Sequence, residues 1–299
     1  MKVAVTGANG LLGGEAVDLL AGRHEVLAMG RGPSRLPPGA YTWADVDLGG
    51  GRSAEAALRD FRVEAVLHAG ALTDVDACER DPERAWRVNV DGTAEIARAC
   101  RALGARLVAV STDYVFDGEA GPYGEEAVPN PRGVYARSKR AGEEAALLLA
   151  PDCAVARVAV IYSGRPGARP TFATQIVEKL SRGEKVHAFS DQWVSPTLAR
   201  NGAEMTLELL LETGHRGVLH TCGATVLDRV DFARRVARRF GLEGEIVPVR
   251  TADAKLAAPR PLRGGLRVDR AAALLRAKPL AVDAQLEGFH AEWSRRAKR

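Results

Sequence analysis

The sequence predicts an α/β fold in which a doubly wound parallel sheet is joined to a smaller C-terminal lobe. Two observations carry this prediction. Strand-like and helical patterns alternate over the first 162 residues, and the strand-like runs are almost continuously apolar. Strands of that composition are typical of parallel sheets that helices cover on both faces. Right-handed crossovers then wind such a sheet in two directions.

The first half of the chain supplies the clearest elements. Residues 2–6 (KVAVT) indicate a short buried strand, and 15–22 (EAVDLLAG) indicate a helix closed by a glycine. The stretch 31–39 (RGPSRLPPG) is rich in proline and glycine and predicts a loop. Asp81 and Pro82 have the character of an N-cap and a first helical residue. Further strands are expected at 24–29, 64–70, 105–112 and 153–162, and further helices at 54–61, 82–103 and 135–149.

The pattern loosens after residue 162. The run 217–223 (GVLHTCG) indicates one more strand of the main sheet. We therefore expect residues 1–162, with a returning strand near 217–221, to form one domain. Residues 163–299 form most of a smaller, interleaved lobe over the carboxyl ends of the strands. Within this lobe we expect a loop at 164–172 and a short strand at 246–249. We expect helices at 172–183, 231–241 and 282–296, and a further helix in the second part of 190–214.

Composition excludes several classes of protein. Hydrophobic residues make up 46% of the 299 residues, which is enough for a large core and is not typical of a disordered chain. No apolar run approaches the roughly 18 residues of a membrane span. The N-terminus shows no h-region and no cleavage site. We therefore expect neither a membrane span nor a signal peptide.

Charge and cysteine usage narrow the class further. The net charge is +4, and the tail AEWSRRAKR supplies +3 of it, so we expect no nucleic-acid partner. No two cysteines form a close pair, and no Cys/His cluster has zinc spacing. We therefore expect no metal site, and free buried thiols in a cytoplasmic protein. The cysteines concerned are Cys78, Cys100, Cys153 and Cys222.

The turn that follows the first strand has the spacing of a dinucleotide-binding loop. It also opens a helix, which is the context that such a motif requires. Its first glycine permits a tight turn, its second lets the backbone approach a pyrophosphate, and its third allows close helix packing. The helix N-terminus adds free N–H groups and a positive dipole end. The turn predicts a Rossmann-type, NAD(P)-binding domain, with cofactor contacts from Gly7, Asn9, Gly10, Leu11, Leu12 and Gly13.

The end of the second strand distinguishes the two nicotinamide cofactors. A carboxylate there binds the ribose 2′-hydroxyl, whereas an arginine accepts a 2′-phosphate. The strand ends in Arg31 and has no acid, so we expect NADPH to be preferred, with NADH as the alternative. Asp47 and Leu48 follow the third strand and are expected to flank the adenine. Further cofactor contacts are expected from His68, Ala69, Gly70, Thr73 and Asn89, although the His68 side chain itself is better explained as packed or hydrogen-bonded than as catalytic.

A tyrosine and a lysine share one face of a later helix. Tyr135 and Lys139 are four residues apart, and carbonyl reduction needs a proton donor at the oxygen. A tyrosine has an ordinary pKa near 10, which a nearby ammonium lowers by stabilising the phenolate. Ser111 and Thr112 end a strand at the carboxyl edge, where a hydroxyl can hold the substrate carbonyl. Together with the glycine turn, these residues predict a reductase that transfers hydride to a carbonyl, with cofactor contacts from Tyr135 and Lys139.

Four stretches together resemble one family over nearly the whole chain. They are TGANGLLGG, STDYVFDG at 111–118, YARSKRAGE at 135–143 and SDQWVSPT at 190–197. They are similar to the extended short-chain dehydrogenase/reductases, most of all to the dTDP-4-dehydrorhamnose reductase group. A C-terminal stretch, Ala258 to Pro261 with Leu266, also resembles a motif of that group.

The resemblance implies roles for individual residues. Thr112, Tyr135 and Lys139 would be catalytic, and Lys139 would also hold the nicotinamide ribose. The implied reaction is reduction of a nucleotide-linked 4-keto-6-deoxy sugar to dTDP-rhamnose. The nucleotide sugar would then be the small-molecule partner, and a homodimer is the assembly to consider. Substrate contacts are expected from Thr112, Asp113, Tyr114 and Arg260.

Two stretches differ from the pattern of that group. Val160 stands where the family often has a tryptophan beside the sugar. After the Arg-Pro pair the family usually has an Asn or Tyr together with a Ser, whereas this chain has LRGG at 262–265. Both lie on the substrate side, so a reductase of another ketone or sugar nucleotide stays open. A third alternative is a regulatory subunit that binds the cofactor without catalysis. The presence of Thr112, Tyr135 and Lys139 together favours an enzyme.

Overall fold

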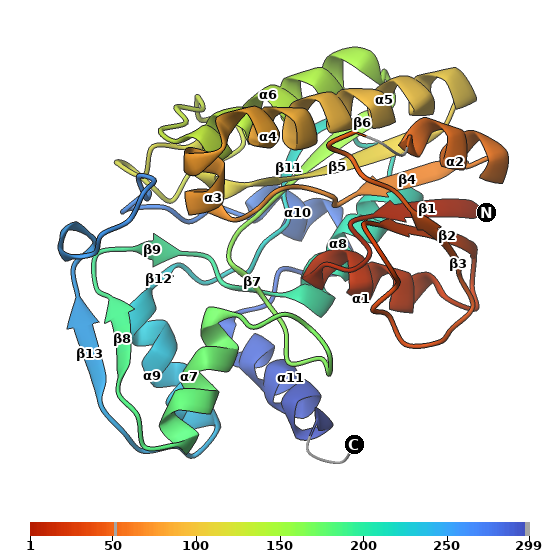
Figure 1. Ribbon diagram of the computed structural model, residues 1–299. Helices are drawn as coiled ribbons and strands as arrows, with labels where there is room; N and C mark the ends of the chain where they lie inside the picture. Colours follow the sequence, from red (N-terminus) through yellow and green to blue (C-terminus); the bar gives the residue numbers. More distant parts are fainter. Residues whose placement is uncertain (51–52, 297–299) are drawn as a thin grey trace.

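The computed structural model describes residues 1–50 and 53–296, so Lys298 and Arg299 of the predicted basic tail lie outside the described residues. Its main sheet has seven parallel strands in the order β11-β6-β5-β4-β1-β2-β3 (Figure 1). The order reverses at β1, so the predicted doubly wound α/β fold is confirmed. The strands are β1 (Lys2–Thr6), β2 (Glu25–Gly30), β3 (Thr42–Asp45), β4 (Ala65–His68), β5 (Arg106–Thr112), β6 (Cys153–Val158) and β11 (Gly217–His220).

Helices cover both faces of this sheet because its strands are apolar on both sides. α1 (Leu11–Leu20) and α8 (Ala199–Leu211) pack together on one face, where Val3 and Val5 of β1 contribute to the core. α2 (Ala54–Phe61), α5 (Gly92–Leu103) and α6 (Val134–Leu149) cover the other face (Figure 1). Loops that follow the strands therefore meet at one edge, where ligands of such folds bind.

The helix expected from Asp81 begins as predicted but is not uniform. Asp81 caps α4 (Pro82–Trp86) by accepting a hydrogen bond from the N–H of Arg84 at 3.0 Å. A π-helical turn, η1 (Arg87–Asp91), separates α4 from α5, and such turns have no simple sequence signal. A short helix that we did not predict, α3 (Val75–Arg80), precedes α4.

Two predicted boundaries are wrong. α1 begins at Leu11, so half of the predicted turn is already helical. The strand expected at 153–162 is broken: β6 ends at Val158, and β7 (Ile161–Tyr162) belongs to a different sheet, where it pairs with β10 (Thr197–Leu198). Val160 has a φ of +39° between them. The chain leaves the main sheet here, although its apolar composition continues.

Apart from α8, α10 and β11, which pack with the main sheet, the elements after β7 form the C-terminal lobe, whose core contains Phe232 and Phe289 together with Tyr162 of β7. α7 (Phe172–Ser181), α9 (Arg229–Arg239) and α11 (Val282–Ser294) enclose that core (Figure 1). The predicted strand at 246–249 is β13 (Ile246–Val249), and it pairs with β8 (Val186–Phe189). The remaining elements are β9 (Trp193–Val194), β12 (Leu227–Asp228), α10 (Asp269–Leu274) and the 3₁₀ turns η2 (Asp113–Val115) and η3 (Thr251–Asp253).

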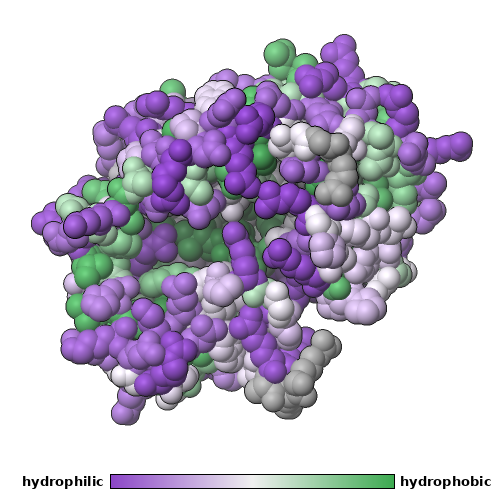
Figure 2. Space-filling view, in the orientation of Figure 1, coloured by the Kyte–Doolittle hydropathy of each residue, from purple (hydrophilic) through white to green (hydrophobic). Residues whose placement is uncertain are grey.

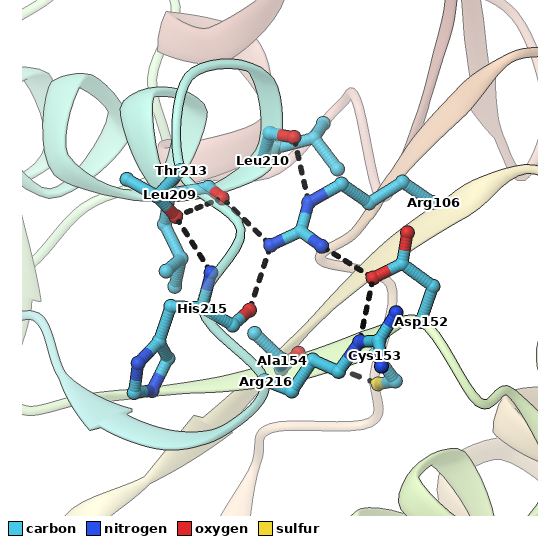
Figure 3. A network of polar contacts seen from close by, with 9 residues as sticks. All are labelled: Arg106, Asp152, Cys153, Ala154, Leu209, Leu210, Thr213, His215 and Arg216. Carbon is cyan, nitrogen blue, oxygen red and sulfur yellow. Dashed lines mark hydrogen bonds and ion pairs between the residues drawn. The ribbon is translucent and has the colours of Figure 1, made fainter.

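One arginine at the start of β5 holds the segment that precedes the returning strand β11 (Figure 3). Arg106 donates to the carbonyls of Leu209 and Leu210 at the end of α8 and to that of His215 at 2.7 Å. It also pairs with Asp152 at 2.6 Å. The segment between α8 and β11 is therefore held beside the start of β5 and β6.

None of the described helices is long and apolar enough to cross a membrane.

Candidate active site

The glycine turn has the geometry that its spacing predicts. Gly7 has a φ of +66°, and a Cβ there would lie 2.7 Å from the backbone of Ala69. A Cβ on Gly13 would meet the carbonyl of Gly7, and Gly10 donates to that same carbonyl at 2.8 Å. α1 then begins at Leu11 without a side-chain cap, so its first N–H groups remain free for a ligand. These residues fit the pyrophosphate of a dinucleotide.

A cavity of about 210 Å³ lies beside this turn. Five predicted cofactor residues line it: Gly7, Arg31, Asp47, Leu48 and Gly70. The other residues of its wall are not among the predicted contacts, although several adjoin them at the ends of β1, β2 and β4. Arg84 of α4 and Val88 of η1 have no such sequence signal, because they reach the cavity only through the fold. The other residues of the wall are Thr6, Met29, Gly30, Val46, Ala71, Leu72, Arg84 and Val88.

Three other predicted cofactor residues make contacts within the protein. Asn9 accepts from the N–H of Arg35 at 2.8 Å and donates to the carbonyl of Pro33, so it braces the loop after β2. Asn89 is buried, and its amide binds the backbone of Leu72 and the hydroxyl of Ser138. Thr73 is exposed and accepts a hydrogen bond from Arg169, which lies in the loop before α7.

His68 is part of a buried chain of hydrogen bonds. Thr93 donates its hydroxyl to the carbonyl of Asn89, so His68 Nε2 is the donor toward Thr93 at 3.0 Å, and Nδ1 of the neutral ring accepts from the hydroxyl of Thr6 at 2.7 Å. Thr6 Oγ1 also accepts from the N–H of Gly70. Burial and the charge of Lys139 lower the pKa of His68 to about 3, so the ring is neutral. His68 therefore joins β1, β4 and α5.

The fold brings Thr112, Tyr135 and Lys139 together at the carboxyl edge of β5. All three side chains are more than 90% buried. The hydroxyl of Thr112 donates to Asp113 Oδ1 at 3.1 Å and accepts from the N–H of Tyr114 at 3.2 Å. The ring of Tyr114 contacts that of Tyr135 edge-on, at 5.7 Å between ring centroids. Lys139 lies one turn farther along α6 and donates from Nζ to the carbonyl of Val110 at 2.8 Å. An ammonium has three N–H donors, so two more can bind other groups.

Burial dominates the ionisation of these groups. It lowers the pKa of Lys139 to about 8, whereas the carboxylate of Glu143 acts in the opposite direction. Burial also raises the pKa of Tyr135 above its usual range, although the nearby hydroxyl of Thr112 acts to lower it. Lys139 is not among the groups that shift the pKa of Tyr135 most. Its ammonium is instead directed to the carbonyl of Val110.

The predicted substrate residues lie around this centre. Asp113 is buried next to Thr112, and burial raises its pKa to about 6. Burial also raises the pKa of Tyr114. Arg260 is largely buried and forms an ion pair with Asp76 of α3 at 2.7 Å, so its guanidinium already has a carboxylate partner. Tyr162 lies in the core of the lobe, where its ring packs against those of Phe232 and Phe289.

The surface is hollowed between the main sheet and the C-terminal lobe. Figure 2 shows hydrophobic residues on the floor of this hollow and hydrophilic residues around its rim. Among residues 1–50 and 53–296, no group of three or more His, Cys, Asp or Glu side chains is placed to hold a metal ion. The four cysteines are free and buried. The arrangement therefore offers hydroxyl, phenol and ammonium groups beside a dinucleotide cradle.

Comparisons with known proteins show which family the chain belongs to. The family described as RmlD substrate binding domain matches residues 1–294. A dTDP-4-dehydrorhamnose reductase of Mycobacterium tuberculosis is 37% identical over 268 residues, 87% of this chain and 82% of that protein. Methionine adenosyltransferase 2 subunit beta of Bos taurus is 30% identical over 275 residues, 90% of this chain and 81% of that protein.

A solved structure matches over almost the whole chain. It is a dTDP-4-dehydrorhamnose reductase from Bacillus anthracis in complex with NADP, and it covers 97% of this chain and 98% of its own. The TM-score is 0.85 at 25% sequence identity. The predicted family is therefore confirmed: the chain belongs to the RmlD substrate-binding domain family of NAD(P)-dependent sugar-nucleotide reductases.

Proposed function

We propose that this protein uses NADPH to reduce the ketone of a nucleotide-linked 4-keto-6-deoxy sugar, with dTDP-rhamnose as the product. One observation carries the proposal. Thr112, Tyr135 and Lys139 come together, buried, at the strand edge that also carries the glycine turn. The relatives named as dTDP-4-dehydrorhamnose reductases support the choice of sugar.

The three residues divide the chemistry among them. When bound, the reduced nicotinamide supplies the hydride. The phenol of Tyr135 gives its proton to the carbonyl oxygen as negative charge develops there, and the hydroxyl of Thr112 orients that oxygen. Lys139 keeps two N–H donors beyond its bond to Val110, and these suit the hydroxyls of the nicotinamide ribose. Its positive charge also stabilises the phenolate that remains after proton transfer.

The experiment measures oxidation of NADPH with ketones on dTDP-, UDP- and GDP-linked sugars and with simple ketones. Tyr135→Phe keeps the ring and removes the proton, so turnover falls by about 10²–10⁴. Folding and NADPH affinity survive this change. Lys139→Met impairs both turnover and cofactor binding, whereas Thr112→Val acts mainly on turnover. The three losses do not add, because the residues act as one unit.

Near-normal turnover by Tyr135→Phe would show that the proton has another source, with Tyr114 as the next residue to change. Turnover only with other ketones would keep the chemistry and reject the sugar. The chain also resembles a protein that is named as a subunit, methionine adenosyltransferase 2 subunit beta. Tight NADPH binding without turnover on any ketone would support a second function, that of a regulatory subunit that binds the cofactor.

A further inference from the structure

A buried ion pair lies directly behind the proposed catalytic residues. Glu143 follows Lys139 by four residues on α6 and Tyr135 by eight, so the three share one helix face. Arg157 of β6 binds its carboxylate through two hydrogen bonds of 2.8 Å, from Nε to Oε1 and from Nη2 to Oε2. Arg140, on the rim of the same helix, adds a third at 3.0 Å.

Stability alone does not account for this pair. Glu143 and Arg157 are only 2% and 1% exposed, and desolvating two charges usually costs as much as their attraction returns. Nη1 of Arg157 is buried with no hydrogen-bond partner among the described residues, although the guanidinium lies over the ring of Phe116 at 5.0 Å. Apolar residues of similar size would pack here at no greater cost.

A small cavity connects the pair to the proposed active site. Lys139 and Glu143 both line it, together with His68 of β4 and with Val110 and Ser111 of β5. His68 is neutral, β5 contributes only a carbonyl and a hydroxyl, and Arg157 of β6 binds Glu143. Among the described residues that line this cavity, Glu143 is therefore the one acid that faces Lys139.

We propose that Glu143, held in place by Arg157, is a positioning residue that keeps Lys139 protonated at the pH at which the proposed reduction takes place. The inference rests on the proposed function of Lys139. Burial on its own favours the neutral amine, and a fixed carboxylate one helical turn away opposes that effect. Arg157 is needed because it keeps the carboxylate itself ionised: although burial raises the pKa of Glu143, the bonds from Arg157 hold it below its usual value.

Removing the charge of Glu143 shifts the pKa of Lys139 in one direction only, downward. Protonated Lys139 is present below its pKa and is lost as the pH rises through it. Glu143→Gln removes the charge that raises this pKa, so Lys139 loses its proton at a lower pH. An opposite charge at close range shifts a pKa by about one unit or more. The alkaline limb of the pH profile of kcat/KM therefore moves to lower pH by about one unit.

The test titrates the full-length protein by ¹³C NMR of the lysine ε-carbons. The chain has only seven lysines, and the signal that Lys139→Met removes identifies Lys139. We expect the Lys139 midpoint to fall by about one pH unit in Glu143→Gln. Glu144→Gln is the matched control, because Glu144 is the next residue, pairs with the same Arg140 and is 61% exposed. It leaves the midpoint unchanged.

A double change covers the case in which Glu143→Gln does not fold. Glu143→Gln with Arg157→Met leaves no unpaired charge in the core, and it lowers the midpoint in the same direction. An unchanged Lys139 midpoint in either folded variant overturns the inference. The NMR readout needs no turnover, so it decides the role of Glu143 even if the unaltered protein reduces no ketone. A failure of the unaltered protein to reduce any ketone would reject only the proposed function.

Discussion

Arg31 shows how much a single residue can decide at the cofactor site. It follows β2 directly, is exposed, and lines the cavity beside the glycine turn. No acid ends β2 itself, although Asp47 lines the same cavity and Asp45 of β3 accepts from the N–H of Gly32 at 2.7 Å. A guanidinium binds a phosphate through two parallel hydrogen bonds, so we expect Arg31 in this position to favour NADPH.

Changing Arg31 to Ala raises the KM for NADPH by about tenfold or more, the loss expected for one charge-assisted pair. The KM for NADH changes by less than about twofold, because NADH has no 2′-phosphate. Steady-state kinetics with both cofactors measure the difference. Arg35→Ala is the control, since Arg35 is exposed on the same loop but does not line the cavity. Equal use of NADPH and NADH by the unaltered protein contradicts the assignment.

At the scale of elements, the position of α8 relative to β11 depends on one side chain. Arg106, at the start of β5, satisfies carbonyl groups at the end of α8 that the helix itself leaves free (Figure 3). It also binds the carbonyl of His215 just before β11. These contacts join a helix and an edge strand to the middle of the sheet.

Arg106→Met keeps the apolar stem and removes the donors, so the carbonyls of Leu210 and His215 lose their bond to the guanidinium. Asp152 keeps its second partner, Arg216, at 3.3 Å. We expect the free energy of unfolding to fall by about 3 kcal/mol, a value typical of breaking a mostly buried network. Urea denaturation followed by circular dichroism measures the loss. Asp152→Asn separates the contributions: Asp152 is 48% exposed, so this change costs less than about 1 kcal/mol. Equal losses in both variants would place the energy in the ion pair instead of the carbonyl bonds.

At the scale of the whole molecule, the C-terminal segment is bound to elements that lie far earlier in the chain. Arg260 pairs with Asp76 of α3, more than 180 residues earlier in the chain. Near it, Arg263 donates to the carbonyl of Gly118, and Gly121 donates to the carbonyl of Arg263. Arg169 reaches Thr73 from the loop before α7. These contacts join segments that are far apart in the sequence.

Arg260 is expected to affect sugar-nucleotide binding and not the cofactor. Arg260→Ala weakens the binding of a dTDP-sugar, measured by calorimetry, and leaves NADPH affinity unchanged. Asp76→Asn is the informative control. If Arg260 contacts the diphosphate directly, Arg260→Ala has much the larger effect; if it only ties the segment to α3, the two changes act alike. Unchanged dTDP-sugar affinity in Arg260→Ala shows that the residue has no part in binding.

The sequence by itself determined the features that depend on neighbouring residues. Period and composition predicted the parallel sheet, the glycine spacing predicted the turn at Gly7, and Asp81 predicted a helix start. Tyr135 and Lys139 could be placed on one face because a helix repeats every 3.6 residues. Such signals are local, so they can be recognised before any tertiary contact is known.

Only the tertiary structure decided which distant groups meet. The break at Val160 arises because the chain changes sheets, and Arg84 reaches the cofactor cavity because α4 lies over it. Lys139 binds the carbonyl of Val110, and Glu143 binds Arg157, because α6 packs against β5 and β6. Polar side chains bind whichever partners the packing of helices on the sheet brings within reach. That packing depends on the burial of the whole core and not on the spacing of any one motif.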